Sequence, residues 1–260
     1  MEYRRFGKTN INVSVITLGG MRYNKTWENP REELPQETID ECADTVKKAL
    51  DNGINLIETA YGYTKSEHLY GHVLNDVLKL DRSSYYLMTK GAPNEGGKST
   101  RSLIKAQLNA LKTDYFDFYA IHGINSQEVF DKACGKDGVI HELLKLKEEG
   151  VIKHIGFSTH GKLDIIEKTI NTDLFDFVNL HYYYFFQRNK PAIDLAAKKD
   201  MGVFIISPND KGGQLYKAPK KLTELTKPFT PIQWNAKYCL GHETIHTLTF
   251  GLKKHVHLIN

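Results

Sequence analysis

The chain has 260 residues, of which 40% are hydrophobic and 25% charged, and its net charge is +4. This composition is typical of a globular protein, and the charge is too small to indicate nucleic-acid binding. Three cysteines without a CxxC pair give no sign of a disulfide framework or a cysteine-based metal site, and they favour a cytoplasmic location. The N-terminus lacks an apolar signal core, and no apolar run approaches the roughly 18 residues of a membrane span. We therefore expect no nucleic-acid and no membrane partner.

Short apolar runs alternate with amphipathic segments along the chain. The runs that predict strands are residues 13–18, 54–57, 85–89, 116–121, 154–157, 175–180, 203–207 and 246–250. The segments that predict helices are residues 37–50, 103–111, 140–149, 163–169, 192–199 and 232–240, with a further helix capped by Ser66.

This alternation indicates a parallel sheet, and the count of strands favours a closed (β/α)8 TIM barrel over an open sheet. No proline- or serine-rich linker interrupts the chain, so we expect a single domain over residues 1–260. Residues 3–13 contain a turn-like Gly7-Lys8-Thr9-Asn10 segment and predict a small hairpin before the barrel. The chain ends at Asn260, soon after the eighth strand, so the last helix is expected to be incomplete.

Polar residues follow most of the predicted strands. They are Glu58, Lys90, His122, His160, His181 and Asp210. Because a closed barrel directs the carboxyl ends of its strands to one face, these side chains are expected to meet in one cavity. The long loop of residues 22–35 either covers that cavity or is a plain surface excursion.

Carbonyl reduction is the first chemistry that these residues allow. An adjacent ammonium favours the phenolate form of a tyrosine, so Lys90 would tune Tyr63 as a proton donor. Glu58 would hold the ammonium, and His122 would donate to the substrate oxygen as negative charge develops there.

Metal-assisted hydrolysis is the second chemistry. His122, His160, His181 and either Glu58 or Asp210 would then bind a divalent ion. The strand ends contain no compact ligand motif such as HxH, and this alternative gives no role to Lys90 or Tyr63.

At these residues the sequence resembles the aldo-keto reductase family. Residues 53–63, followed by Lys65-Ser66-Glu67, are similar to the family signature GINFFDTAxxYGxSE. The strands that end at Lys90 and His122 match its lysine and histidine positions. Residues 19–23, 58–63, 122–125, 156–161, 186–193 and 204–216 are also similar to motifs of a bacterial subgroup of predicted oxidoreductases. Some of those relatives carry a ferredoxin-like C-terminal region that has no counterpart here.

The resemblance implies a role for each catalytic candidate. Tyr63 would be the general acid, Lys90 would tune it, and His122 would orient and polarise the carbonyl. Glu58 stands where the family usually has aspartate. The implied substrate is a small aldehyde or ketone, or an alcohol in the reverse direction.

The resemblance also implies that NADP(H) is the cofactor. The residues expected to contact it are Gly20, Met21, Ser158, Thr159, Asn179, Ser207, Asn209, Lys211, Lys253, Lys254 and His257. The last three favour the 2′-phosphate of NADP over NAD. Asn179 replaces the usual glutamine, and Ile206 stands where the family usually has an aromatic ring. Because of the Glu58 substitution, Ile206 and the short C-terminus, a nucleotide-binding regulatory subunit with little turnover is a further alternative.

Overall fold

The computed structural model describes residues 1–23, 25–94, 99–210 and 212–251. Two short antiparallel strands, β1 (Tyr3–Arg5) and β2 (Asn12–Ser14), form the predicted hairpin at the start of the chain. Phe6 follows β1 and is fully buried. Its ring packs against Phe118 at 5.4 Å and Phe177 at 5.6 Å between ring centroids. The hairpin therefore contributes an apolar side chain to the barrel interior.

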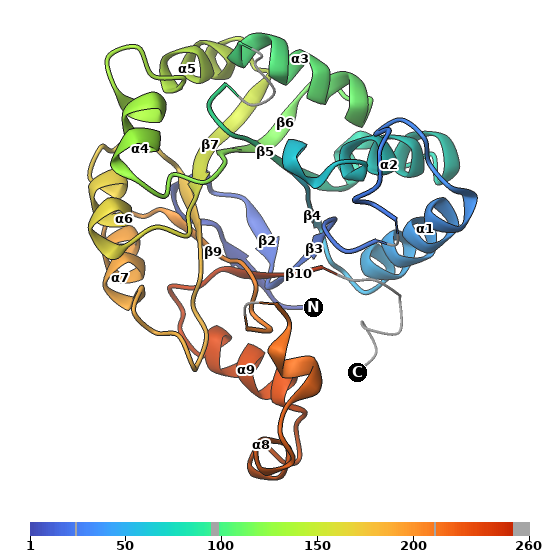
Figure 1. The fold of residues 1–260 in the computed structure, drawn as a ribbon, viewed down its shortest axis with the longest axis vertical. Helices are drawn as coiled ribbons and strands as arrows, with labels where there is room; N and C mark the ends of the chain where they lie inside the picture. The colour runs from blue at the N-terminus through green and yellow to red at the C-terminus, as the bar shows by residue number, and fades with distance from the viewer. Residues whose placement is uncertain (24, 95–98, 211, 252–260) are drawn as a thin grey trace.

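A closed barrel of eight parallel strands forms the centre of the molecule, which confirms the predicted (β/α)8 fold (Figure 1). In barrel order from the first strand, these are β3 (Ile16–Gly19), β4 (Leu56–Glu58), β5 (Tyr86–Gly91), β6 (Phe116–Ile121), β7 (Ile152–Ser158), β8 (Phe177–Leu180), β9 (Gly202–Ile205) and β10 (Thr247–Gly251). The prediction of one strand over residues 13–18 was wrong. The chain bends at Val15, so that β2 belongs to the hairpin and β3 to the barrel.

Helices surround the barrel on its outside (Figure 1). They are α1 (Gln36–Asp51), α2 (Ser66–His72), α3 (Thr100–Leu111), α4 (Gln127–Cys134), α5 (Ile140–Glu148), α6 (Leu163–Ile170), α7 (Lys190–Lys198), α8 (Lys220–Leu225) and α9 (Pro231–Leu240). All the predicted helices are present, whereas α4 and α8 were not predicted. In α1, Ile39, Cys42, Val46 and Ala49 are buried, and their spacing places them on the face that packs on the barrel.

Ser66 does not cap its helix, contrary to the prediction. Lys65 occupies the N-cap position of α2, and Ser66 is the first helical residue. The Ser66 hydroxyl instead accepts a hydrogen bond of 2.7 Å from Thr59. This bond ties the start of α2 to the end of β4, close to the carboxyl face of the barrel.

The barrel interior is apolar, apart from the polar side chains at the ends of the strands. A buried cluster fills it with Phe6, Val13, Leu56, Met88, Phe118, Ala120, Phe177 and Phe204. A second, larger cluster lies between the strands and the helices. Because the barrel is packed, the space for a ligand lies where the strands end. No helix within the described ranges is both long and apolar enough to cross a membrane.

Candidate active site

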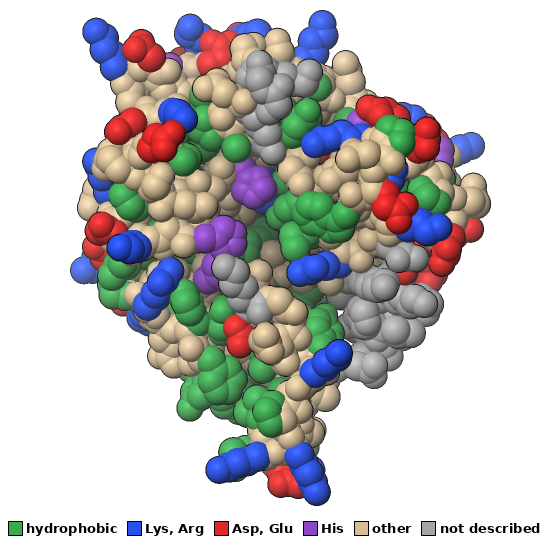
Figure 2. Space-filling model, in the orientation of Figure 1, with side chains coloured by type: hydrophobic (Ala, Val, Ile, Leu, Met, Phe, Trp, Pro, Cys, Tyr) green, Lys and Arg blue, Asp and Glu red, His purple; other side chains and the backbone are tan. Residues whose placement is uncertain are grey.

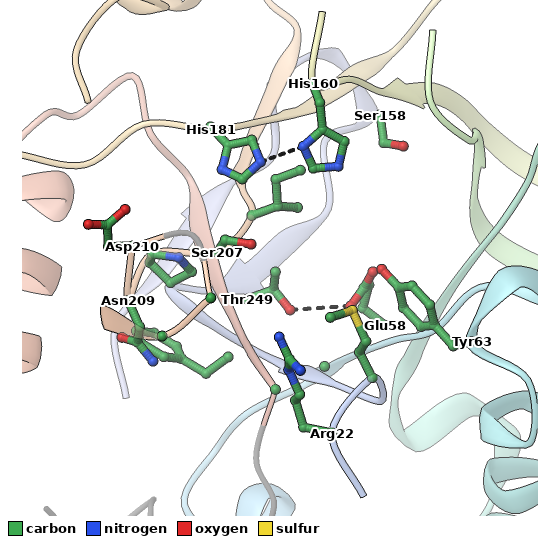
Figure 3. Close-up of a pocket in the computed structure, with 18 of the residues that line it drawn as sticks. Arg22, Glu58, Tyr63, Ser158, His160, His181, Ser207, Asn209, Asp210 and Thr249 are labelled. Atoms are coloured by element: carbon green, nitrogen blue, oxygen red, sulfur yellow. Dashed lines mark hydrogen bonds between the residues drawn. The ribbon is translucent and has the colours of Figure 1, made fainter. Parts of the chain in front are cut away.

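A cavity of about 440 Å³ opens at the carboxyl ends of the barrel strands (Figure 3). Figure 2 shows this face of the molecule hollowed at its centre, with histidine side chains beside the hollow. Glu58, Tyr63, Lys90 and His122 all line the cavity. The structure thus brings together the four residues that were predicted from the sequence to carry out carbonyl reduction.

Glu58 and Lys90 form a buried ion pair across neighbouring strands. Glu58 ends β4 and Lys90 lies in β5, and their side chains are 3% and 2% exposed. The carboxylate contacts the ammonium directly, so the longer glutamate still reaches the lysine. Lys90 Nζ also donates to the Thr59 carbonyl at 2.9 Å, and the Thr249 hydroxyl donates to Glu58 Oε2 at 3.3 Å. Burial lowers the pKa of Lys90, while the adjacent carboxylate favours its charged form.

Tyr63 ends a short 3-10 turn (Tyr61–Tyr63) that follows β4. Its backbone N–H donates to the Ala60 carbonyl at 3.0 Å, which fixes the turn. The Lys90 ammonium lies 4.8 Å from the centroid of the Tyr63 ring. Burial raises the pKa of Tyr63 to about 12, and the nearby charge of Arg22 partly opposes this effect. The phenol therefore carries its proton at neutral pH and is able to donate it.

His122 follows β6 directly and lies beside Tyr63. The two rings are perpendicular, with centroids 6.0 Å apart. The backbone N–H of His122 donates to the Gly91 carbonyl at 2.9 Å. Burial and the charges of Lys90 and His160 lower the pKa of His122 to about 3. At neutral pH the ring is uncharged and offers one N–H as a donor.

Four of the residues predicted to bind the cofactor line the same cavity. They are Met21, Ser158, Ser207 and Asn209. The Ser158 hydroxyl accepts a hydrogen bond from the Gly123 N–H at 3.1 Å, so its own proton is available to a ligand. Ser207 adopts a positive φ of 53° at the start of the loop after β9.

Three other predicted cofactor residues lie outside the cavity lining. Gly20 packs so closely on Tyr70 that a Cβ atom would lie 2.4 Å from its ring. Thr159 is buried, and its hydroxyl donates to the Ile124 carbonyl at 2.7 Å. Asn179 is also buried, and its Oδ1 has no hydrogen-bond partner among the described residues.

The remaining predicted cofactor contacts fall on positions that the structure does not describe. They are Lys211, Lys253, Lys254 and His257.

Arg22 lines the cavity and was missed by the sequence analysis. Figure 3 shows its guanidinium group extending into the space between Asn209 and Thr249. It forms no hydrogen bond or ion pair with the rest of the described chain. The available signal was its position, since it closely follows the first barrel strand, where side chains reach the carboxyl face.

The structure gives little support to the metal-dependent alternative. His160 and His181 contact each other at 2.6 Å, and Asp210 also lines the cavity. Within the described ranges, however, no group of three or more His, Cys, Asp or Glu side chains is arranged to hold a metal ion. The polar groups that do converge are the acid, ammonium, phenol and imidazole described above.

The chain is similar to several known proteins. It is 32% identical over 153 residues to D-arabinose 1-dehydrogenase of Saccharomyces cerevisiae, covering 56% of this chain and 43% of that protein. It is 29% identical over 195 residues to the NADH-specific methylglyoxal reductase of Escherichia coli, covering 62% of this chain and 56% of that protein. The chain thus spans about half the length of these curated relatives.

A solved structure shares the fold. The aldo-keto reductase from Klebsiella pneumoniae in complex with NADPH superimposes with a TM-score of 0.77 and 17% identity, over 99% of this chain and 87% of that one. The sequence profile described as the aldo/keto reductase family matches residues 15–239. Since this match covers most of the chain, including Glu58, Lys90 and His122, the chain belongs to the aldo/keto reductase family.

Proposed function

We propose that the chain binds NADP(H) and reduces the carbonyl group of a small aldehyde or ketone, or oxidises the alcohol in the reverse direction. The observation that carries this proposal is the buried contact between Glu58 and Lys90 next to Tyr63 and His122. Membership of the family supports it. The names of two relatives, a D-arabinose dehydrogenase and an NADH-specific methylglyoxal reductase, support the carbonyl chemistry. The NADPH complex of the Klebsiella protein supports the choice of NADP(H).

The polar groups around the cavity fit the cofactor. Asn209 Oδ1, on the cavity lining, is a buried acceptor without a hydrogen-bond partner in the described chain, and such an atom is costly to leave unpaired. An amide or hydroxyl donor of a nicotinamide nucleotide would satisfy it. The Arg22 guanidinium supplies positive charge for a pyrophosphate. The preference for NADPH over NADH rests on Lys253, Lys254 and His257 through the family resemblance.

The cofactor and residues of the cavity would have separate roles in the reduction of the carbonyl group. A reduced nicotinamide held beside Ser158, Ser207 and Asn209 would supply the hydride for the carbonyl carbon. Tyr63 donates its proton to the carbonyl oxygen, which completes the alcohol. The positive charges of Lys90 and Arg22 stabilise the phenolate that this transfer leaves. The N–H of neutral His122 donates to the same oxygen while negative charge develops on it.

A turnover assay tests the proposal. The purified full chain is incubated with NADPH and a panel of small aldehydes and ketones, and both NADPH loss and alcohol formation are measured. We expect one alcohol for each NADPH oxidised. Tight NADPH binding without turnover on any compound would contradict the proposal and favour a regulatory nucleotide-binding subunit.

A further inference from the structure

The loop between β3 and α1 packs on the turn that carries Tyr63. We call residues 25–35 of this loop the strap; the structure describes all of them, and none of them lines the cavity. The Trp27 ring of the strap lies 6.1 Å from the Tyr63 ring between centroids, and its indole N–H donates to the Met21 carbonyl at 3.0 Å. The strap is therefore more than a surface excursion, because it contacts the proposed proton donor.

The strap also bonds to the chain on both sides of Tyr63. The Arg31 guanidinium donates to the Tyr61 carbonyl at 2.9 Å. The Lys65 backbone N–H donates to the Thr26 carbonyl at 3.0 Å. Tyr61 and Lys65 lie two residues before and two residues after Tyr63, so the strap holds both ends of this short turn.

The side chain of Lys65 adds a charged connection to the same strap. Lys65 is 2% exposed, which is unusual for lysine. Its Nζ donates to the carbonyls of Pro30 and Glu33, the second at 2.6 Å. Hydrogen bonds from a charged donor are roughly twice as strong as neutral ones, and a buried ammonium needs them in place of water. Lys65 therefore holds the middle of the strap against the start of α2.

The residue between Tyr63 and Lys65 has a strained backbone. Thr64 has φ 48° and ψ −98°, and a positive φ is an outlier for a β-branched residue. The signature GINFFDTAxxYGxSE has glycine at this position, and glycine adopts a positive φ without steric cost. A strained backbone persists only where its surroundings fix it. The bonds of Lys65, the next residue, supply that restraint.

We propose that Lys65 is a positioning residue for Tyr63, because it holds the strained turn against the strap and so keeps the phenolic oxygen directed at the cavity. This inference rests on the proposed function, in which that oxygen supplies the proton. Lys65 does not itself line the cavity, and it acts through the backbone of Thr64. Without its bonds the turn would relax and carry the phenol away from the carbonyl oxygen.

The test replaces Lys65 by methionine, which keeps the side chain long and removes its charge and donors. The carbonyl probe is 4-nitrobenzaldehyde or, if another compound of the panel turns over faster, that compound. We expect the single-turnover rate of NADPH oxidation to fall about 10- to 100-fold, since a displacement of about 1 Å at reacting groups has an effect of this size. The Kd of NADPH is expected to stay within about twofold, because the cofactor site is untouched.

Tryptic cleavage gives a second measurement that does not depend on turnover. In the wild type the Arg31 guanidinium bonds to Tyr61 and lies 4.0 Å from the centroid of its ring, so cleavage after Arg31 is expected to be slow. In Lys65→Met the strap is expected to open more often, and cleavage there to be at least about fivefold faster. Lys47→Met removes an exposed lysine of α1 and should change neither rate.

The variant Thr64→Gly separates positioning from a merely structural role. Glycine accepts the backbone angles of this position, so Thr64→Gly alone should keep the wild-type rate within about twofold. In the Thr64→Gly background, Lys65→Met should slow turnover less than about fivefold, because little strain remains to be opposed. A structural role of Lys65 would give the same loss in both backgrounds.

Three results would overturn the inference. The first is a folded Lys65→Met that turns over within about twofold of the wild type. The second is a parallel loss of NADPH affinity, which would assign Lys65 to the cofactor site. The third is an equal loss of rate with and without Thr64→Gly.

If Lys65→Met does not fold, Arg31→Met decides the question, since it removes the bond to Tyr61 from a half-buried side chain. Its single-turnover rate is expected to fall at least about threefold with the Kd of NADPH unchanged, and an unchanged rate would overturn the inference. Failure of the proposed function looks different, because the wild type would then oxidise NADPH with no carbonyl compound.

Discussion

The Glu58 carboxylate contacts the Lys90 ammonium across β4 and β5, and both side chains are almost completely buried. In a buried environment each charge is stable only when the other is present, because a single buried charge would have neither water nor a partner to solvate it. The Thr59 carbonyl and the Thr249 hydroxyl complete the hydrogen bonds of the pair. The pair thereby holds a positive charge beside the Tyr63 ring.

Removing one charge of this pair is expected to destabilise the fold. Glu58→Gln leaves the Lys90 ammonium buried without its partner and should lower the free energy of unfolding by about 3–5 kcal/mol. Chemical denaturation at pH 7 measures the change. The double variant Glu58→Gln/Lys90→Met should recover most of the stability without recovering turnover. If the free energy of unfolding of Glu58→Gln lies within about 1 kcal/mol of the wild-type value, the two charges do not depend on each other as a buried ion pair would.

The pH profile of carbonyl reduction follows from His122 and Tyr63. His122 has a pKa of about 3, so it stays neutral throughout the physiological range. Tyr63 has a pKa of about 12 and keeps its proton until strongly alkaline pH. We expect kcat/KM for reduction to show no His122 inflection between about pH 5 and 8 and to fall only at high pH, whereas alcohol oxidation rises with pH. An inflection near pH 6.5 that His122→Asn removes would mean that His122 titrates as an ordinary imidazole.

Arg22 is expected to contribute to cofactor binding. Arg22→Met should raise the Kd of NADPH about tenfold, since a charge-assisted contact with a pyrophosphate is lost, and should weaken the dependence of Kd on salt. Fluorescence titration over a range of salt concentrations measures both effects. Lys47→Met removes one positive charge from the exposed surface of α1 and serves as the matched control. Equal Kd values for the two variants would place Arg22 outside the cofactor site.

Asp176, at the opposite end of the barrel from the cavity, is expected to act on stability alone. Burial by itself would raise its pKa. The nearby His154 ring, 3.7 Å away, and hydrogen bonds from Lys147 and the Ile155 N–H outweigh burial and lower the pKa from 3.8 to about 2. A depressed carboxyl pKa stabilises the fold above about pH 4, and this contribution disappears as pH falls towards 2.

Asp176→Asn should therefore lose about 2 kcal/mol of stability at pH 7, with a smaller loss at pH 3. Thermal unfolding at both pH values measures the difference. Asp51→Asn removes an exposed partner of Lys47 and should change stability by less than about 1 kcal/mol. A loss from Asp176→Asn that does not depend on pH would argue against the charged form as its source.

The barrel was predictable because its strands and helices have strong periodic patterns. The exceptions have local causes. The bend at Val15 falls inside a continuous apolar run, so periodicity could not separate β2 from β3. Serine is a common capping residue, but the Ser66 hydroxyl accepts a bond from Thr59 just after β4, a contact that a helix-capping pattern does not describe. Helix α8 is a short polar segment without a buried residue, so it has no apolar stripe to detect.

The catalytic candidates were predictable because strand ends in a barrel converge. The sequence could not predict which of the neighbouring side chains face the cavity, because their direction depends on local packing. Thr159 immediately follows Ser158, yet its hydroxyl turns to the Ile124 carbonyl and leaves only Ser158 on the wall. Arg22 reaches the cavity from a loop, where no periodic pattern fixes its direction.

Replacing Tyr63 by phenylalanine removes the phenolic oxygen while keeping the ring that packs beside His122, and it tests most directly whether that oxygen supplies the proton. Turnover and NADPH affinity are measured on the same preparation. We predict that kcat falls at least about 100-fold while the Kd of NADPH stays within about twofold. An unchanged kcat in Tyr63→Phe would contradict the reductase mechanism.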